Sequence, residues 1–153
     1  MSNTKDNIKR GSCPVYKKCG GCQLQNLTYQ EQLAFKQKMV QNNLERIGGL
    51  SDFEMYPVIG METPYAYRNK AQFPVGEDKD GNIVIGFYAG RTHHIVEQTD
   101  CCIGAPENGE VLRKVKAYMQ KNQIRPYNEE HHSGIVRHIL IRTGYHTKEI
   151  MVC

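Results

Sequence analysis

Six cysteines carry the strongest chemical signal in this sequence of 153 residues. They are Cys13, Cys19, Cys22, Cys101, Cys102 and Cys153. Three of them fall between Cys13 and Cys22, and Gly20-Gly21 separates the last two. The two glycines let the backbone turn tightly, so that its amides can point toward sulfur. Cysteines clustered in this way in a cytosolic chain predict metal binding or catalysis.

A fourth thiol, from Cys101 or Cys102, would give a ligand set with three near members and one remote member. Structural zinc usually takes its thiolates as two close pairs, whereas each iron of a four-iron cluster takes one thiolate. The spacing therefore favours a four-iron cluster that is structural or redox-responsive, because no iron is left open. Structural zinc and buried cysteines without a ligand role remain alternatives. Disulfides are a weaker alternative in a reducing compartment.

Composition limits the class of protein to which the chain can belong. Lysine and arginine number 20 against 16 acidic residues, which gives a net charge of +4. This mild excess does not by itself indicate a nucleic-acid partner, so the placement of the cations matters more. The sequence has no run of about 18 apolar residues and no apolar core of a secretory signal at its N-terminus. We therefore expect a soluble, cytoplasmic chain without a membrane partner, and a flexible tail over residues 1–11.

A helix is predicted directly after the cysteine loop. Thr28 and Glu31 form a capping-box pattern at its start, and Gly48-Gly49 provides a left-handed stop at its end. Apolar residues between these signals recur at steps of three, four and seven, which predicts one apolar stripe. The stripe residues are Tyr29, Leu33, Val40, Leu44 and Ile47.

The remaining sequence indicates strands and one further helix. Strands are predicted over 69–75, 83–89, 94–96, 135–142 and 149–153, with a short edge strand over 55–59. A helix is predicted over 106–122, with a packing face of Val111, Leu112, Val115, Tyr118 and Met119. This order predicts an α+β fold, an antiparallel sheet with two packing helices and an N-terminal cysteine-rich cluster loop. The loop is assigned to 12–27 and a central domain to 28–153. Because the last residues resemble the middle of an apolar strand, we expect the chain to be truncated before a further domain.

Longer motifs extend the cysteine pattern along nearly the whole chain. They are Cys13-Pro14, Cys19-Gly20-Gly21-Cys22-Gln23-Leu24-Gln25, Tyr29-x3-Leu33-x2-Lys36, Tyr67-Arg68-Asn69-Lys70, Gly86-Phe87-Tyr88, His94-Ile95-Val96, Cys101, Arg137-His138, Arg142-x-Gly144 and Thr147-Lys148-Glu149. In this order they resemble the bacterial 23S rRNA (uracil-5-)-methyltransferase family, which makes 5-methyluridine and has tRNA-modifying relatives. The resemblance covers only the N-terminal and central, iron–sulfur-bearing portion of that family.

The resemblance implies a 4Fe-4S cluster held by Cys13, Cys19, Cys22 and Cys101. The family's fourth cysteine lies five residues after the position of Val96, which selects Cys101 and leaves Cys102 as an extra thiol without a ligand role.

The family's reaction is attack of a cysteine thiolate on uracil carbon 6, methyl transfer from S-adenosylmethionine to carbon 5, and removal of the carbon 5 proton. This chain has neither a glycine-rich cofactor loop nor the motif of that nucleophile. We therefore expect no catalytic and no cofactor-binding residue in the chain, with S-adenosylmethionine bound only through a C-terminal methyltransferase domain that is missing from it.

Aromatic and cationic residues around position 68 predict contacts with RNA. Single-stranded RNA is bound by stacking on aromatic rings and by cations at its phosphates. Tyr67, Arg68 and Lys70 combine both properties, and Arg91 extends the same predicted surface. The alternative is a solvated strand edge whose cations prevent aggregation. The adjacent His131 and His132 are interpreted as loop residues and not as a metal site.

Two functions of different class follow from these patterns. The first is the cluster-bearing, RNA-facing part of an S-adenosylmethionine-dependent RNA (uracil-5-)-methyltransferase. Its partners would be RNA, rRNA more than tRNA, and its own C-terminal methyltransferase domain; the 153-residue chain would be monomeric and inactive by itself. The alternative is a stand-alone metal-binding or nucleic-acid-binding module without enzymatic activity. The reading frame downstream of Cys153 discriminates between the two.

Overall fold

The computed structural model describes residues 13–153, so the predicted flexible tail over 1–11 lies outside the described residues. These residues form two compact units. One runs over Gln23–Pro64, and the other combines Cys13–Cys22 with Tyr65–Cys153. The cysteine loop Cys13–Cys22 is thus grouped with the sheet and not with the helix that follows it. Within residues 13–153, no helix has the length and apolar character needed to cross a membrane.

The unit Gln23–Pro64 contains the first helix, α1, over Tyr29–Asn42. Its capping box forms as predicted: the Thr28 side chain accepts a hydrogen bond from the Glu31 backbone, and the Glu31 carboxylate accepts one from the Thr28 amide at 2.7 Å. The helix continues as a π-helical turn, η2, over Asn43–Ile47. Gly49 then has a φ of +65°, the left-handed conformation that glycine adopts without strain.

Two sequence predictions fail in this unit. Of the five residues of the predicted apolar stripe, only Tyr29 is buried, and Ile47 is 83% exposed. No strand forms over residues 55–59. That segment is instead held by side chains of α1, because Val58 donates its amide to the Gln37 side chain at 2.9 Å. Next to it, the Met61 amide donates to the Tyr29 hydroxyl at 2.6 Å.

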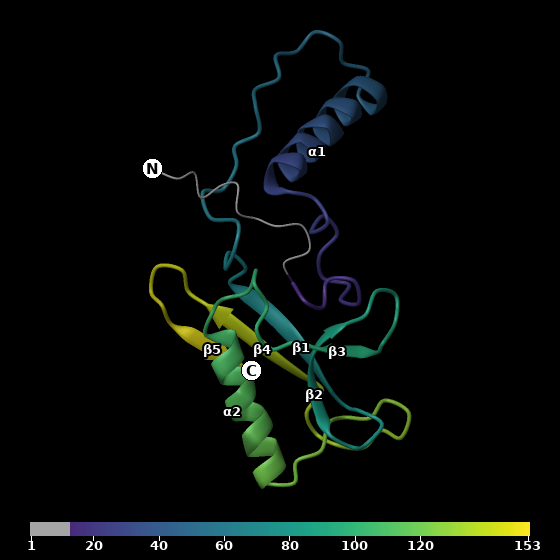
Figure 1. Ribbon diagram of the computed structural model, residues 1–153, viewed down its shortest axis with the longest axis vertical. Coiled ribbons are helices and arrows are strands. Elements are labelled where there is room, and N and C mark those ends of the chain that lie inside the picture. The colour runs from purple at the N-terminus through teal and green to yellow at the C-terminus, as the bar shows by residue number, and fades with distance from the viewer. Residues whose placement is uncertain (1–12) are drawn as a thin grey trace. The chain divides into compact units, whose positions relative to one another are not determined.

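The second unit is built on a five-stranded sheet with the order β3-β2-β1-β4-β5, in which all neighbours are antiparallel (Figure 1). The strands are β1 Lys70–Glu77, β2 Ile83–Tyr88, β3 Ile95–Glu97, β4 His138–Thr143 and β5 Ile150–Val152. The second helix, α2, covers Asn108–Lys121. The structure therefore confirms the α+β class and the antiparallel sheet.

The core of this unit lies between α2 and one face of the sheet (Figure 1). Its fully buried side chains are Phe73, Ile85, Leu112, Met119 and Ile141. Burying one such side chain stabilises the fold by about 1.5–3 kcal/mol. The predicted packing face of α2 holds for Leu112 and Met119 but is wrong for Tyr118, which is 62% exposed.

The opposite face of the sheet carries the outward members of the strand alternation. In register across β1 and β4, Lys70 lies directly opposite Arg142, and Pro74 lies opposite His138. Lys70 and Arg142 are both exposed, and neither forms an ion pair with another described residue. Like charges placed directly opposite one another are destabilising, so the two cations concentrate positive charge at this end of the sheet.

Candidate functional site

Backbone pairing fixes two cysteine-containing segments in the second unit, the loop Cys13–Cys22 and the segment with Cys101 and Cys102. In the loop Cys13–Cys22, Cys19 forms a β-bridge with Ala89, and the Gly20 amide donates to the Tyr88 carbonyl at 3.1 Å. The loop is therefore attached to the turn that follows β2.

The second cysteine segment is attached to a different extended piece of the same unit. The Ala66 amide donates to the Cys102 carbonyl at 3.0 Å, and the Arg68 amide donates to the Ile103 carbonyl at 2.9 Å. Arg68 also forms a parallel bridge with Gly104. Residues 66–68 thus run alongside residues 102–104, and this pairing places Arg68 next to the segment that contains Cys101 and Cys102.

The thiols interact electrostatically across these segments. Burial raises the pKa of the Cys22 thiol above its usual value, and the charge of Cys101 raises this pKa further. Arg68 acts in the opposite direction, and Cys102 and Cys19 raise the pKa by smaller amounts. Two of the other predicted ligands, Cys19 and Cys101, therefore lie within electrostatic range of Cys22, as does the Arg68 guanidinium.

The donor chemistry of this group fits a thiolate-ligated metal centre. Soft thiolates are the ligands of iron–sulfur clusters, and hydrogen bonds to sulfur are one of the means by which proteins tune such clusters. One is present here, because the Gly21 amide donates to the Cys19 sulfur at 3.4 Å.

The four predicted ligands are not gathered into one group in the described residues. Over residues 13–153, no three His, Cys, Asp or Glu side chains are close enough to hold a metal ion. Cys13 is half-buried at the start of the loop, where its carbonyl accepts from the Tyr16 amide at 3.2 Å. The assignment of Cys13, Cys19, Cys22 and Cys101 as ligands therefore stays a prediction.

The four predicted RNA contacts occupy different environments in the same unit. Tyr67 is 47% exposed and Lys70 is exposed, as a contact residue requires. Arg68 is half-buried and faces the cysteines. Arg91 is exposed with a φ of +62°, and it lines a shallow recess with Gly20 and Gly21. Arg142 is a further exposed cation directly opposite Lys70, and its register there could not be counted from the sequence.

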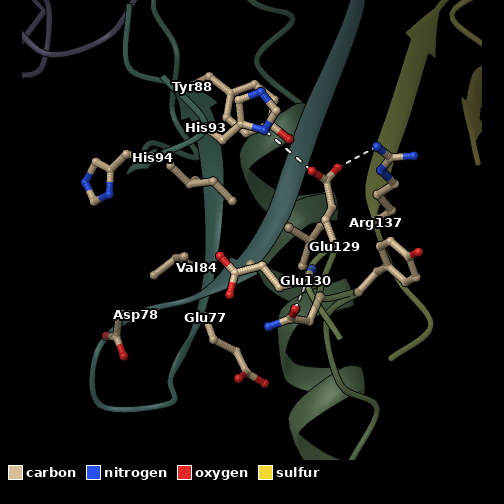
Figure 2. Close-up of a pocket in the computed structure, with 14 residues that line it drawn as sticks. Glu77, Asp78, Val84, Tyr88, His93, His94, Glu129, Glu130 and Arg137 are labelled. Carbon is tan, nitrogen blue, oxygen red and sulfur yellow. Dashed lines mark hydrogen bonds and ion pairs between the residues drawn. The ribbon is translucent and has the colours of Figure 1, made fainter. Parts of the chain in front are cut away.

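A second feature that the sequence did not indicate is a pocket of about 610 Å³ (Figure 2). It is lined by Val75, Gly76, Glu77, Asp78, Val84, Tyr88, His93, His94, Ile95, Tyr127, Asn128, Glu129, Glu130 and Arg137. Tyr88 and His93 pack ring against ring with centroids 5.6 Å apart, and the His138 ring meets Tyr88 edge-on at 6.4 Å. Glu129 joins the two sides, because it pairs with Arg137 and, at 3.5 Å, with His93.

Curated relatives match the chain along almost its whole length. A protein of Bacillus cereus named uncharacterized RNA methyltransferase is 49% identical over 144 residues, which are 94% of this chain and 31% of the relative. A protein of Halalkalibacterium halodurans with the same description is 49% identical over 92% of this chain and 30% of its own length. A Staphylococcus aureus protein, also so described, is 38% identical over 99% of this chain and 34% of its own length. The chain is homologous to bacterial RNA methyltransferases. It spans about a third of the length of these relatives, and no family model matches it.

A solved structure agrees with these relatives in fold. The crystal structure of Pyrococcus abyssi tRNA (uracil-54, C5)-methyltransferase in complex with S-adenosyl-L-homocysteine superposes with a TM-score of 0.68. It is 29% identical in sequence and covers 92% of this chain and 32% of its own chain. The expected relationship to RNA methyltransferases is thereby confirmed for this segment.

Proposed function

We propose that this chain is the iron–sulfur-bearing, RNA-facing part of an S-adenosylmethionine-dependent RNA (uracil-5-)-methyltransferase. The observation that carries the proposal is the meeting of the cysteine loop with Cys101 in a unit homologous to RNA methyltransferases. The substrate class rests on the relatives and on the solved tRNA methyltransferase. We place the methyl donor and the reacting uridine in the remaining two thirds of the relatives' length, with rRNA as the preferred substrate over tRNA and the cytoplasm as the site of action.

Within this chain, Cys13, Cys19, Cys22 and Cys101 would hold the 4Fe-4S cluster. When bound, the cluster supplies a covalent cross-link between the loop and residue 101, and a redox-responsive charge. Ligation needs thiolates, so loading releases protons. Burial opposes ionisation of Cys22, whereas Arg68 favours it. We therefore assign Arg68 as the positive charge that stabilises the ionised cysteine thiols. Lys70, Tyr67 and Arg91 are assigned as RNA contacts.

Anaerobic purification followed by metal analysis tests the cluster. We expect a brown protein with about four irons per chain, whose visible absorbance falls on reduction. A serine at any of the positions 13, 19, 22 or 101 should abolish iron binding, while the matched control Cys102→Ser should retain it. Stoichiometric zinc without iron in the anaerobic protein would contradict the proposal and support a structural zinc site. Equal iron loss from Cys101→Ser and Cys102→Ser would overturn the choice of the fourth ligand.

A further inference from the structure

The pocket in Figure 2 has aromatic surface on more than one of its sides. The stacked pair of Tyr88 and His93 comes from the end of β2 and the turn after it. Tyr127 comes from the segment before β4, and the Arg137 guanidinium lies 5.8 Å from the centre of its ring. Rings exposed in a recess of this size can receive another flat ring, since ligand pockets run from about 300 to 1,000 Å³.

The pocket also contains four carboxylates, three of which already have partners. Glu129 pairs with Arg137 and His93, and Glu77 lies 3.8 Å from Arg125. Asp78 accepts from the backbone and side chain of Asn82 and from the Asp80 amide, which lowers its pKa. These three groups are therefore committed to the protein's own structure.

Glu130 is the exception among the pocket's carboxylates. Its backbone is fixed, because its amide donates to the Asn128 side chain at 2.9 Å. Its side chain reaches across the pocket toward Val84 on β2 (Figure 2). Among residues 13–153, its carboxylate has no hydrogen-bond or ion-pair partner. A carboxylate without a partner, placed beside exposed rings by a backbone that is held, can accept from a flat ligand that carries adjacent N–H donors.

We propose that this pocket binds one unstacked guanine base of the RNA. The inference rests on RNA binding by the proposed function and adds to it a base-specific site away from the reacting uridine. Sequence-specific RNA recognition uses splayed bases that stack on aromatic rings and hydrogen-bond through their Watson–Crick edges. The guanine edge presents N1–H and the 2-amino group side by side, which match the two oxygens of the Glu130 carboxylate. Uracil offers one such donor, so it is the weaker ligand.

The position of the pocket on the sheet is compatible with an RNA strand. Val84, Tyr88 and Ile95 lie on the sheet face opposite α2, the same face that carries Lys70 and Arg142. Six residue steps along β1 separate Lys70 from Gly76 in the pocket, which is about 20 Å of extended strand. Phosphates of one RNA strand can therefore contact Lys70 and Arg142 while a base of the same strand enters the pocket.

Binding of short fluorescent RNAs to the chain tests this site. The dissociation constants of three RNA oligomers are measured by fluorescence anisotropy at low salt. The first is a uridine heptamer, and the other two carry guanosine or inosine at the central position. Inosine differs from guanosine only in lacking the 2-amino group. We expect guanosine to be preferred over inosine by about tenfold, the value of one well-made bidentate contact. Glu130→Gln should reduce that preference to about twofold or less, while Glu149→Gln, an exposed control in the turn before β5, should keep it.

The outcomes separate this site from the proposed function. If all three RNAs bind equally and Glu130→Gln changes nothing, RNA binding stands and the guanine site is wrong. If no RNA binds, the RNA-facing role itself fails. If a lysine-rich peptide binds in an E130Q-sensitive manner and RNA does not, the pocket is a site for a basic partner. Because Glu130→Gln could act through folding, its thermal melt by circular dichroism must match that of the unsubstituted chain. Tyr127→Leu is a second variant: it removes a ring of the pocket, so it should weaken the binding of guanosine and of inosine together.

Discussion

The contact between the cysteine loop and the turn after β2 depends on two glycines that face each other, Gly20 and Gly90. A Cβ atom added at Gly20 would lie 3.0 Å from the Gly90 Cα and 3.3 Å from the Tyr88 carbonyl oxygen. Both neighbours are backbone atoms, so no side chain can move aside. Overpacking of this kind costs about 1–3 kcal/mol, and the lower entropy of the unfolded chain returns about 0.4–1 kcal/mol on Gly→Ala replacement. We therefore expect Gly20→Ala to lower the free energy of unfolding by about 1 kcal/mol.

The matched control is Gly90→Ala. Its Cβ would lie 4.0 Å from the Gly20 Cα, which is ordinary van der Waals contact, and neither glycine has a positive φ. Thermal melting of both variants should show a midpoint lower by about 2–4 °C for Gly20→Ala, since about 1 kcal/mol corresponds to that shift in a chain of this size. Gly90→Ala should melt at or above the midpoint of the unsubstituted chain. Equal stability of the two variants, or the reverse order, would refute the packing argument.

Two further predictions concern charge. Lys70→Ala should reduce the slope of log affinity for RNA against log salt concentration by about one, the value for one phosphate contact. Arg68→Ala should reduce this slope less, because the Arg68 guanidinium lies near Cys22. Equal slopes for the two variants would show that Arg68 contacts RNA phosphate as Lys70 does. Burial first, and then Arg137, hold the pKa of His138 below its usual 6.5. The folded chain therefore binds this proton more weakly than the unfolded chain, so the stability contribution is complete above about pH 6.5 and is lost as the pH falls through the folded pKa. His138→Gln should flatten the melting midpoint between pH 7 and 5, and a proton NMR titration of His138 at or above 6.5 would contradict the assignment.

The parts of the fold that could be predicted are those fixed by local chemistry. The capping box at Thr28 and the left-handed Gly49 depend on neighbouring residues alone, and both form as expected. The strands of the sheet show the apolar alternation that one buried face imposes, as in Ala71, Phe73 and Val75 of β1. The α+β class follows from the order of these elements and is confirmed.

The parts that could not be predicted depend on partners distant in the sequence. Residues 55–59 have the composition of a strand, but within them the Val58 amide donates to the Gln37 side chain of α1 and not to a neighbouring strand. The pocket joins β1, the segment after β2 and residues 127–130, so no local motif marks it. Arg68 has the same charge as Lys70 two residues later, but its backbone pairs with Ile103 and Gly104, so that it lies half-buried beside the cysteines while Lys70 is exposed.

Tyr88 connects the cysteine loop to the pocket that we propose binds guanine. Its carbonyl accepts the Gly20 amide from the loop, while its ring stacks with His93 and lines the pocket. A loop that is displaced from this carbonyl also loses its bridge between Cys19 and Ala89, so the backbone on which the Tyr88 ring stands is no longer fixed on that side. Gly20→Ala should therefore weaken guanosine binding as well as stability, although Gly20 does not line the pocket. Gly90→Ala should leave guanosine binding unchanged. A Gly20→Ala chain that is less stable but keeps its full guanosine preference would show that the loop supports the fold without orienting the Tyr88 ring.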